Sequence, residues 1–258
     1  MHKTIGIFGD SFADPNSLSG DTPWFKFLEK EEEKIECYGS SGSSLWWSFE
    51  NFLDNYKKYD IIIFVYSCPS RIHSMPKDWG VNHYRKPEGK FSPIFSSLEF
   101  PEELCEDQDK KPDFIEAAIE IYWKYFSNKR LDHFIFQKTF DEINKLCKEE
   151  KIKIINILST NENLDLDYSS GPNFKGMFEI SKKELQLLHP DANTPVDIGY
   201  DSDVRVCHLT QENNAVLANI IGEAIDNYSF DCVYDTVIPL PNDSRFVFNP
   251  SITQRYFP

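Results

Sequence analysis

A serine near the amino terminus and a histidine near the carboxyl terminus are the residues best suited to nucleophilic chemistry. Ser11 lies in the run GDSFAD at residues 9–14, just after a short apolar segment. A serine hydroxyl becomes a strong nucleophile when a neighbouring base accepts its proton, and histidine is the most common base. His208 lies in the turn before the last segment with helical periodicity. We therefore expect Ser11 and His208 to act together as nucleophile and base.

Each residue also has an ordinary structural explanation. An isolated Gly-Asp-Ser run most often caps a helix, because Asp and Ser side chains accept hydrogen bonds from free backbone N–H groups. A single histidine is more often a hydrogen-bonded surface or core residue than a catalytic base. The combination favours catalysis, since Ser11 follows the first predicted strand and His208 precedes the last predicted helix.

The elements that must position these residues alternate between strand and helix patterns. Residues 61–66 (IIIFVY) are almost wholly apolar, as in a central strand covered on both faces. Further strands are predicted at 4–8, 35–38 and 152–158, and helices at 24–34, 46–58, 112–126, 130–149 and after Thr210 as N-cap. This alternation predicts an α/β fold, a three-layer α/β/α sandwich with a mainly parallel, flavodoxin-like sheet. Sites in such sheets lie at the carboxyl ends of the strands.

The 258 residues suit one domain, which we place at 1–228. Residues 67–111 contain several prolines and little periodicity, and we interpret them as an insertion beside the sheet. We expect a long polar loop at 159–202 and an irregular carboxyl-terminal tail at 229–258.

Composition restricts the partners. A net charge of −15 and a pI near 4.8 disfavour nucleic acid and anionic membrane surfaces. The six cysteines form no C-x-x-C pair, and the histidines show no metal-ligand spacing. No phosphate-loop or dinucleotide motif is present, so we expect neither a metal nor a cofactor. We see no signal peptide or transmembrane segment and expect a cytoplasmic or virion-associated protein.

Three blocks of the chain resemble the SGNH (GDSL-type) hydrolases. The first is GDSFAD at 9–14, the second is Gly42 in the run GSSGSS at 39–44, and the last carries His208. The run HLTQENN at 208–214 is also similar to SGNH-type proteins of phages. The resemblance covers roughly 3–68 and 152–226 and implies an SGNH-like fold and serine esterase activity. In that activity Ser11 forms a covalent acyl-enzyme, and the backbone N–H groups of Ser11 and Gly42 stabilise the oxyanion.

Two family features are missing. The third block, G-x-N-D, is replaced by SCPSR at 67–71, so the asparagine that would donate to the oxyanion is absent. Ser67, Ser70 or Arg71 could supply a substitute donor, and Arg71 could alternatively pair with surface carboxylates.

The family's D-x-x-H pattern is also broken, because an arginine stands three residues before His208. Asp203 or Asp201 could support the imidazole, and we favour Asp203. A carbonyl oxygen is the alternative, which would leave a Ser–His dyad.

Aromatic side chains in the insertion suggest a substrate class. Rings beside a cleft stack on sugars, so we expect a small-molecule or carbohydrate ester, such as an O-acetyl group, as substrate. The same rings could instead cover the sheet edge or a subunit interface, and the sequence does not predict the oligomeric state. They are Trp79, His83, Tyr84, Phe91 and Phe95.

Two alternatives to an esterase stay open. One is a catalytically silent SGNH-like module that binds glycans or takes part in assembly. The other is a flavodoxin-like binder of a small ligand, in which the serine-rich loops hold phosphate.

Overall fold

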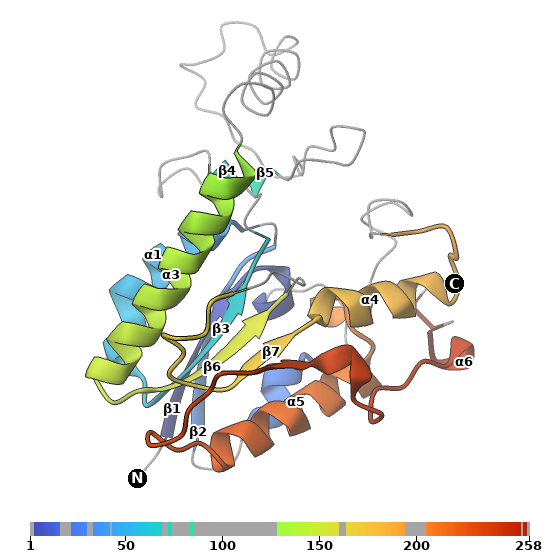
Figure 1. Cartoon of the computed structure of the whole chain (residues 1–258). Coiled ribbons are helices and arrows are strands. Elements are labelled where there is room, and N and C mark those ends of the chain that lie inside the picture. Colours follow the sequence, from blue (N-terminus) through green and yellow to red (C-terminus); the bar gives the residue numbers. More distant parts are fainter. Residues whose placement is uncertain are drawn as a thin grey trace, which may run out of the picture.

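The computed structural model of the chain describes residues 3–15, 22–29, 33–41, 43–68, 72–73, 83–84, 128–159, 164–193, 205–253 and 255–256. Within them, six parallel strands form one sheet with helices on both faces (Figure 1), so the chain has an α/β fold. None of the helices in this part of the chain combines the length and apolar composition needed to cross a bilayer.

The sheet follows the order β2-β1-β3-β6-β7-β8. Its strands are β1 (Lys3–Gly9), β2 (Glu33–Gly39), β3 (Ile61–Tyr66), β6 (Lys153–Leu158), β7 (Asn173–Lys175) and β8 (Val237–Pro239). The chain moves from β1 outward to β2, then returns to the other side of β1 to form β3. The direction of winding therefore reverses between β1 and β3, which is where open α/β sheets bind ligands.

The central position of β3 follows from its composition. All six of its residues are buried, and its side chains alternate between two apolar clusters. Ile61, Ile63 and Val65 contribute to the first cluster. Ile62, Phe64 and Tyr66 contribute to the second. The predicted strand covered on both faces is confirmed.

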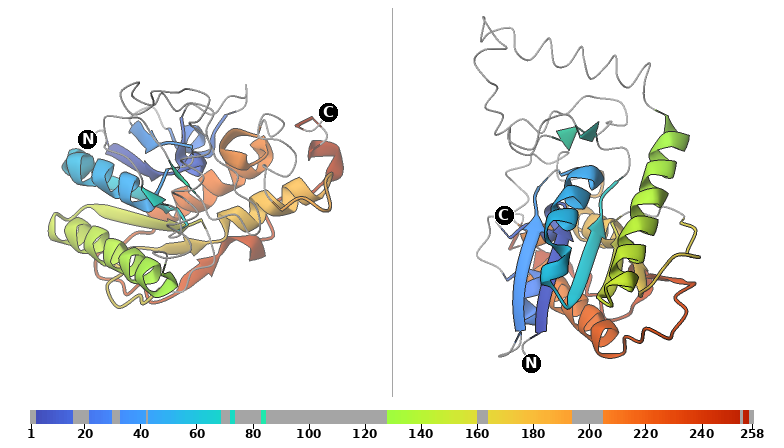
Figure 2. Two further views of the ribbon diagram at one scale, coloured as in Figure 1. Left: turned by 90° about the horizontal axis from the view of Figure 1, so that it is seen from above. Right: turned by 90° about the vertical axis from the view of Figure 1, so that its left-hand side faces the viewer.

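Different helices cover the two faces (Figure 2). The first cluster lies under η2 (Trp24–Leu28), α4 (Met177–Gln186) and α5 (Gln211–Asp226). The second lies under α1 (Leu45–Asn55), the short η3 (Tyr56–Lys58) and α3 (Lys129–Glu149). The predicted helices at 46–58 and 130–149 are thus confirmed within a few residues. Thr210 caps α5 as expected, because its side chain accepts from the N–H of Asn213.

The helix predicted at 24–34 is wrong. Among the described residues of this range the only helix is a short 3-10 helix, η2, and β2 already begins at Glu33. Trp24, Phe25 and Leu28 are buried, but every residue of the following run at 29–34 is charged. Such a run has no apolar face that could continue a packed helix.

The polar loop expected at 159–202 and the irregular tail expected at 229–258 are also corrected. The first contains β7 and α4, and the second contains β8, η11 (Leu240–Asn242) and α6 (Pro250–Thr253). Because β8 pairs in parallel with β7, the sheet extends beyond the predicted domain end at 228. Strands of three residues are too short to show alternation of apolar and polar residues, which explains why β7 and β8 were not predicted.

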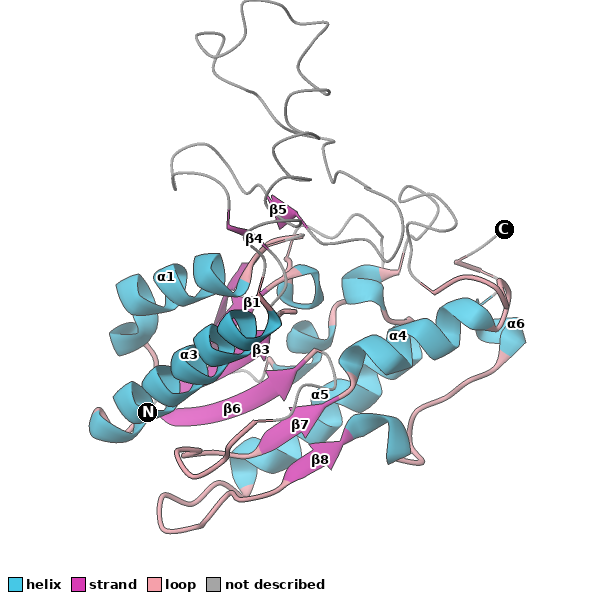
Figure 3. Cartoon of the chain, turned by 45° about the horizontal axis from the view of Figure 1, so that its top comes forward, coloured by secondary structure: helices cyan, strands magenta, loops and turns pink. Residues whose placement is uncertain are grey.

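Besides Ser67 and Cys68 at its start, two segments of the predicted insertion are described. They are β4 (Ile72–His73) and β5 (His83–Tyr84), which pair in antiparallel fashion. Figure 3 shows both beyond the carboxyl ends of β1 and β3. The helix predicted at 112–126 and the rings of Trp79, Phe91 and Phe95 lie outside the described residues.

Candidate active site

Ser11 lies in the tight turn that follows β1. It begins η1 (Ser11–Ala13), and its side chain is almost buried, with 7% of the residue exposed. The carboxylate of Asp10 accepts from the N–H of Phe12 at 3.1 Å, and the N–H of Ala13 donates to the Asp10 carbonyl at 2.9 Å. Asp10 therefore caps this turn, as the ordinary structural explanation of the Gly-Asp-Ser run predicts. The Ser11 hydroxyl is not needed for it.

His208 lies in a turn of unusual backbone conformation, η10 (Val206–His208). Cys207 and His208 both have positive φ angles, 51° and 59°. The left-handed region costs a residue with a side chain about 1–2 kcal/mol. Two consecutive residues there persist only where the surrounding structure holds them, and such sites are concentrated at functional positions.

The turns η1 and η10 are in contact, although almost the whole chain separates them in sequence. The Phe12 ring and the His208 imidazole meet in an edge-to-face arrangement, with centroids 5.4 Å apart. The thiol of Cys207 lies 3.9 Å from the carbonyl oxygen of Asp14. The residues that flank Ser11 therefore contact the turn that carries His208.

The loop after β2 closes on the same region. Ser40 donates from its N–H, and Ser43 from its hydroxyl, to the carbonyl of Gly9, at 3.4 and 3.0 Å. The N–H of Ser41 donates to the carboxylate of Asp14 at 2.8 Å. Gly42, the predicted oxyanion donor of this loop, lies outside the described residues.

Gly39 permits this close approach. A Cβ atom on Gly39 would lie 2.1 Å from the carbonyl oxygen of Ala13 and 2.7 Å from the N atom of Asp14. These distances are far below van der Waals contact, and the atoms belong to the backbone of the Ser11 loop. A side chain at position 39 would therefore displace that loop.

Ser67 directly follows β3 and has an unusual environment. It is fully buried, and its hydroxyl has no hydrogen-bond partner among the described residues. Strand alternation puts it on the same face as Ile63 and Val65, whose cluster also includes Phe12 and Cys207. A buried hydroxyl without a partner costs about 1–3 kcal/mol, so the residue calls for an explanation. The other two candidate donors, Ser70 and Arg71, lie outside the described residues.

Arg205, which precedes His208 by three residues, points into the protein interior. Its guanidinium is fully buried and donates to the carboxylate of Glu184 at 2.9 Å and to the carbonyl of Ser181 at 2.8 Å. Asp203 and Asp201 lie outside the described residues. The residue that supports the His208 imidazole therefore stays a prediction.

Glu184 on α4 is the centre of a buried polar cluster that sequence analysis missed. Its carboxylate accepts from Arg205, from the N–H and hydroxyl of Thr210 at 3.1 and 2.7 Å, and from the side-chain amide of Asn213 at 2.6 Å. We call these four residues the Glu184 cluster. Burial raises the pKa of Glu184, and the positive charge of Arg205 opposes this effect.

No signal in the sequence pointed to Glu184. It lies in the segment expected to be a loop, and a glutamate among lysines resembles an ordinary surface residue. Arg205 carried a weak signal, because it replaces an expected acid.

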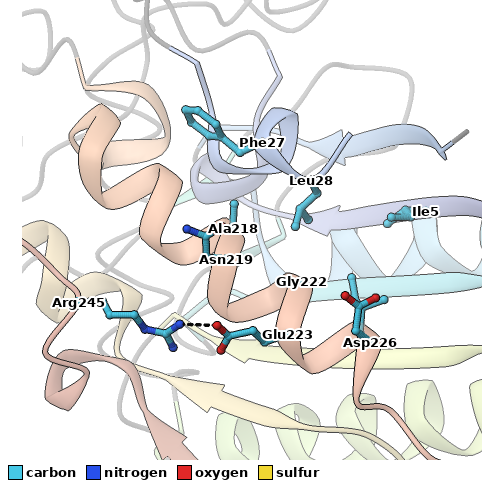
Figure 4. Close-up of a pocket in the computed structure, with 10 residues that line it drawn as sticks. Ile5, Phe27, Leu28, Ala218, Asn219, Gly222, Glu223, Asp226 and Arg245 are labelled. Atoms are coloured by element: carbon cyan, nitrogen blue, oxygen red, sulfur yellow. Dashed lines mark hydrogen bonds and ion pairs between the residues drawn. The ribbon is translucent and has the colours of Figure 1, made fainter. Parts of the chain in front are cut away.

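A cavity of about 320 Å³ lies elsewhere, between η2 and α5 (Figure 4). Ile5 in the first half of β1 and Asp226 at the end of α5 contribute to its lining. It therefore lies toward the amino end of β1, away from Ser11. At its rim Arg245 forms a 2.7 Å ion pair with Glu223.

In the part of the chain that the structure describes, no group of three or more histidine, cysteine or acidic side chains is arranged to hold a metal ion. No family model matches this sequence. No curated protein matches it significantly.

Proposed function

We propose that this protein is a serine esterase of the SGNH kind, with Ser11 as nucleophile and His208 as base on an SGNH-like three-layer sandwich. The observation that carries the proposal is the contact between η1 and η10 beside the carboxyl end of β1. The reversal of winding between β1 and β3 supports it, since this is where a parallel sheet offers a site.

In the proposed reaction, the Ser11 hydroxyl attacks the carbonyl carbon of an ester while His208 accepts its proton. The tetrahedral oxyanion that forms is stabilised by the backbone N–H groups of Ser11 and Gly42. His208 then protonates the leaving alcohol, and the carbonyl re-forms as an ester of Ser11. Water, deprotonated by His208, attacks this acyl-enzyme and releases the carboxylic acid and free Ser11. Asp203 is the proposed support of His208 during these steps.

We assign the third oxyanion donor to Ser67. The family's asparagine is absent here, and Ser67 brings a buried hydroxyl with no partner among the described residues. An oxyanion that forms only in the transition state would satisfy this hydroxyl at the moment when charge develops. Arg71 is the second choice, suited to a substrate that itself carries a carboxylate.

The proposed substrate is a small-molecule or carbohydrate ester, including O-acetyl groups, and the reaction as written needs no cofactor. The position of β4 and β5 beyond the carboxyl ends of β1 and β3 supports a role of the insertion in substrate binding (Figure 3). We propose a cytoplasmic or virion-associated location for this activity.

Hydrolysis of p-nitrophenyl acetate tests the proposal. We expect Ser11→Ala and His208→Gln to lose at least a thousandfold in turnover. A fluorophosphonate probe should label Ser11 in the wild-type protein. Ser159→Ala is the matched control, because Ser159 is a buried serine that follows the neighbouring strand β6. Equal rates for the wild type and Ser11→Ala would exclude the esterase.

One observation favours a second function, the catalytically silent module. Arg205 occupies the position of the family's acid and is held by Glu184. This alternative predicts no labelling of Ser11 and no hydrolysis that depends on it. Binding of acetylated oligosaccharides by the unlabelled protein would then support a role in glycan recognition.

A further inference from the structure

We propose that Glu184 is a positioning residue for His208, holding both ends of the turn that carries the imidazole. This inference rests on the proposed role of His208 as the base. It explains how a chain with arginine in place of the family's aspartate could still fix its histidine.

The first anchor precedes His208. The N–H of His208 donates to the carbonyl of Arg205 at 3.1 Å and closes the turn. The side chain of the same arginine is held at 2.9 Å by Glu184. Movement of the Glu184 carboxylate would therefore be transmitted through one residue to the backbone of His208.

The second anchor follows His208. Both the N–H and the hydroxyl of Thr210 donate to the Glu184 carboxylate. Asn213, one turn further into α5, donates to the same oxygen at 2.6 Å and pairs with the backbone of Val247 at 2.8 and 2.7 Å. The beginning of α5 is thus fixed to α4 through one carboxylate.

The chemistry of this anchor requires a carboxylate. Four different groups donate to Glu184, one of them a guanidinium, and the side chains of Glu184 and Arg205 are fully buried. An ionised carboxylate accepts up to about four hydrogen bonds, whereas an amide oxygen accepts two and its NH₂ group opposes further donors. A glutamine of the same size therefore cannot replace Glu184 in the Glu184 cluster.

The turn needs such support because of its backbone. Cys207 and His208 both occupy the left-handed region. When the anchors at Arg205 and Thr210 are weakened, these two residues are expected to relax toward ordinary φ angles. The imidazole would then leave its place at the edge of the Phe12 ring, 5.4 Å away between centroids.

The test compares Glu184→Gln with Phe140→Leu, a buried substitution on the opposite face of the sheet. The first measurement is the His208 side-chain NMR resonance, assigned by its loss in His208→Gln and sensitive to the ring current of Phe12. We expect this resonance to shift in Glu184→Gln and to stay in place in Phe140→Leu.

The second measurement is the kinetics with p-nitrophenyl acetate. Small misplacements of a catalytic group cost about a hundredfold in rate, so we expect kcat to fall by about that factor in Glu184→Gln with KM nearly unchanged. Phe140→Leu should retain the wild-type kcat. If Glu184→Gln does not fold, the double variant Glu184→Met, Arg205→Met takes its place, because it leaves no unpaired buried charge.

The outcomes separate the two proposals. A His208 resonance that stays in its wild-type position in a folded Glu184 variant overturns the positioning role, as does a shifted resonance with full kcat. If the wild-type protein shows no hydrolysis that depends on Ser11, the esterase proposal fails. The resonance alone then decides whether Glu184 positions His208.

Discussion

The ring of Phe12 meets the imidazole of His208 edge-on, with centroids 5.4 Å apart and ring planes at 65°. Phe12 directly follows Ser11, so this contact links the proposed nucleophile to the proposed base. The carbonyl of Phe12 accepts from the indole of Trp24 at 2.8 Å, and the N–H of Trp24 donates to Asn214 at 3.1 Å. Asn214 belongs to α5, the helix that follows His208, so a second connection runs from Phe12 through Trp24 to this helix.

The first prediction concerns this ring contact. Phe12→Leu keeps an apolar side chain but removes the edge-to-face interaction, which contributes about 0.5–1.5 kcal/mol. Because the imidazole loses a neighbour that fixes its orientation, we expect kcat for p-nitrophenyl acetate to fall by up to about tenfold. The free energy of unfolding in urea should fall as well.

The matched control for this variant is Phe52→Leu. Phe52 makes a comparable edge-to-face contact with Phe8, at 5.7 Å and 81°, on the opposite face of the sheet. It should lose similar stability and keep its kcat. Equal losses of kcat in both variants would mean that Phe12 acts only through stability.

The second prediction concerns the buried hydroxyl of Ser67. Ser67→Ala removes a polar group with no partner among the described residues, so the free energy of unfolding should stay the same or rise. Turnover should nevertheless fall by about a hundredfold to a thousandfold, as is typical when one oxyanion donor is lost. Urea unfolding and p-nitrophenyl acetate kinetics measure the two effects.

Ser159 provides the opposite case. It follows β6 as Ser67 follows β3, but its hydroxyl donates to the carbonyl of Tyr66 at 2.7 Å. Ser159→Ala should therefore lose about 1 kcal/mol of stability and keep its turnover. If Ser67→Ala instead loses stability and retains activity, Ser67 has a structural partner and no role at the oxyanion.

The third prediction compares two glycines. A Cβ atom on Gly39 would overlap the backbone of Ala13, so Gly39→Ala should displace the Ser11 loop and lower stability and turnover together. A Cβ atom on Gly222, in the interior of α5, would lie 3.7 Å from Leu28, an ordinary contact (Figure 4). Gly222→Ala should therefore raise the free energy of unfolding by about 0.5–1 kcal/mol.

Thermal unfolding of the two alanine variants, with the kinetic assay beside it, decides this comparison. Both substitutions add one methyl group, so composition is matched and only the local space differs. A Gly39→Ala variant with wild-type turnover would show that the loop at Ala13 and Asp14 can move without changing the reactivity of Ser11.

Long or strongly periodic segments of the fold were predictable from the sequence. Residues 61–66 are almost wholly apolar, and 130–149 carry an apolar face over many turns, so the apolar pattern in the sequence matches the burial in the fold. The strands β7 and β8 could not be predicted in this way. They contain three residues each, and a buried amide network helps to hold them, in which Asn156 donates to Asn173 at 3.0 Å and Asn173 donates to the carbonyl of Tyr234. Polar residues of this kind resemble a loop in sequence.

For the candidate site, the sequence suggested the two residues proposed for chemistry but not the residues around them. Residue types and the order of elements sufficed to propose Ser11 and His208, because parallel strands bring their carboxyl ends to one edge. The roles of Gly39 and Glu184 depend on distances between segments far apart in the chain. No local pattern reveals that a glycine faces a carbonyl or that a glutamate on α4 accepts from Arg205.

The fourth prediction uses a polar cluster at the outer strand of the sheet. The ammonium of Lys34, which forms an ion pair with Glu36, and the hydroxyls of Tyr59 and Tyr38 lower the pKa of Glu36 to about 2. The folded state therefore favours the ionised carboxylate. Its contribution to stability is present above the ordinary pKa of a glutamate and is lost as the pH falls toward 2.

Urea unfolding between pH 6 and about 2.5 would reveal this contribution as a difference between the wild type and Glu36→Gln. The side chain of Glu36 is 35% exposed, so solvent screening limits the difference to about 1 kcal/mol at neutral pH. We expect it to shrink as the pH falls below the ordinary pKa of a glutamate, because the unfolded wild-type chain then binds a proton at Glu36 that the folded state does not, while glutamine does not change. Tyr59→Phe removes one donor and keeps the ring, and its pH dependence should lie between the other two. A wild-type curve parallel to that of Glu36→Gln over the whole range would show that these hydrogen bonds do not favour the ionised form.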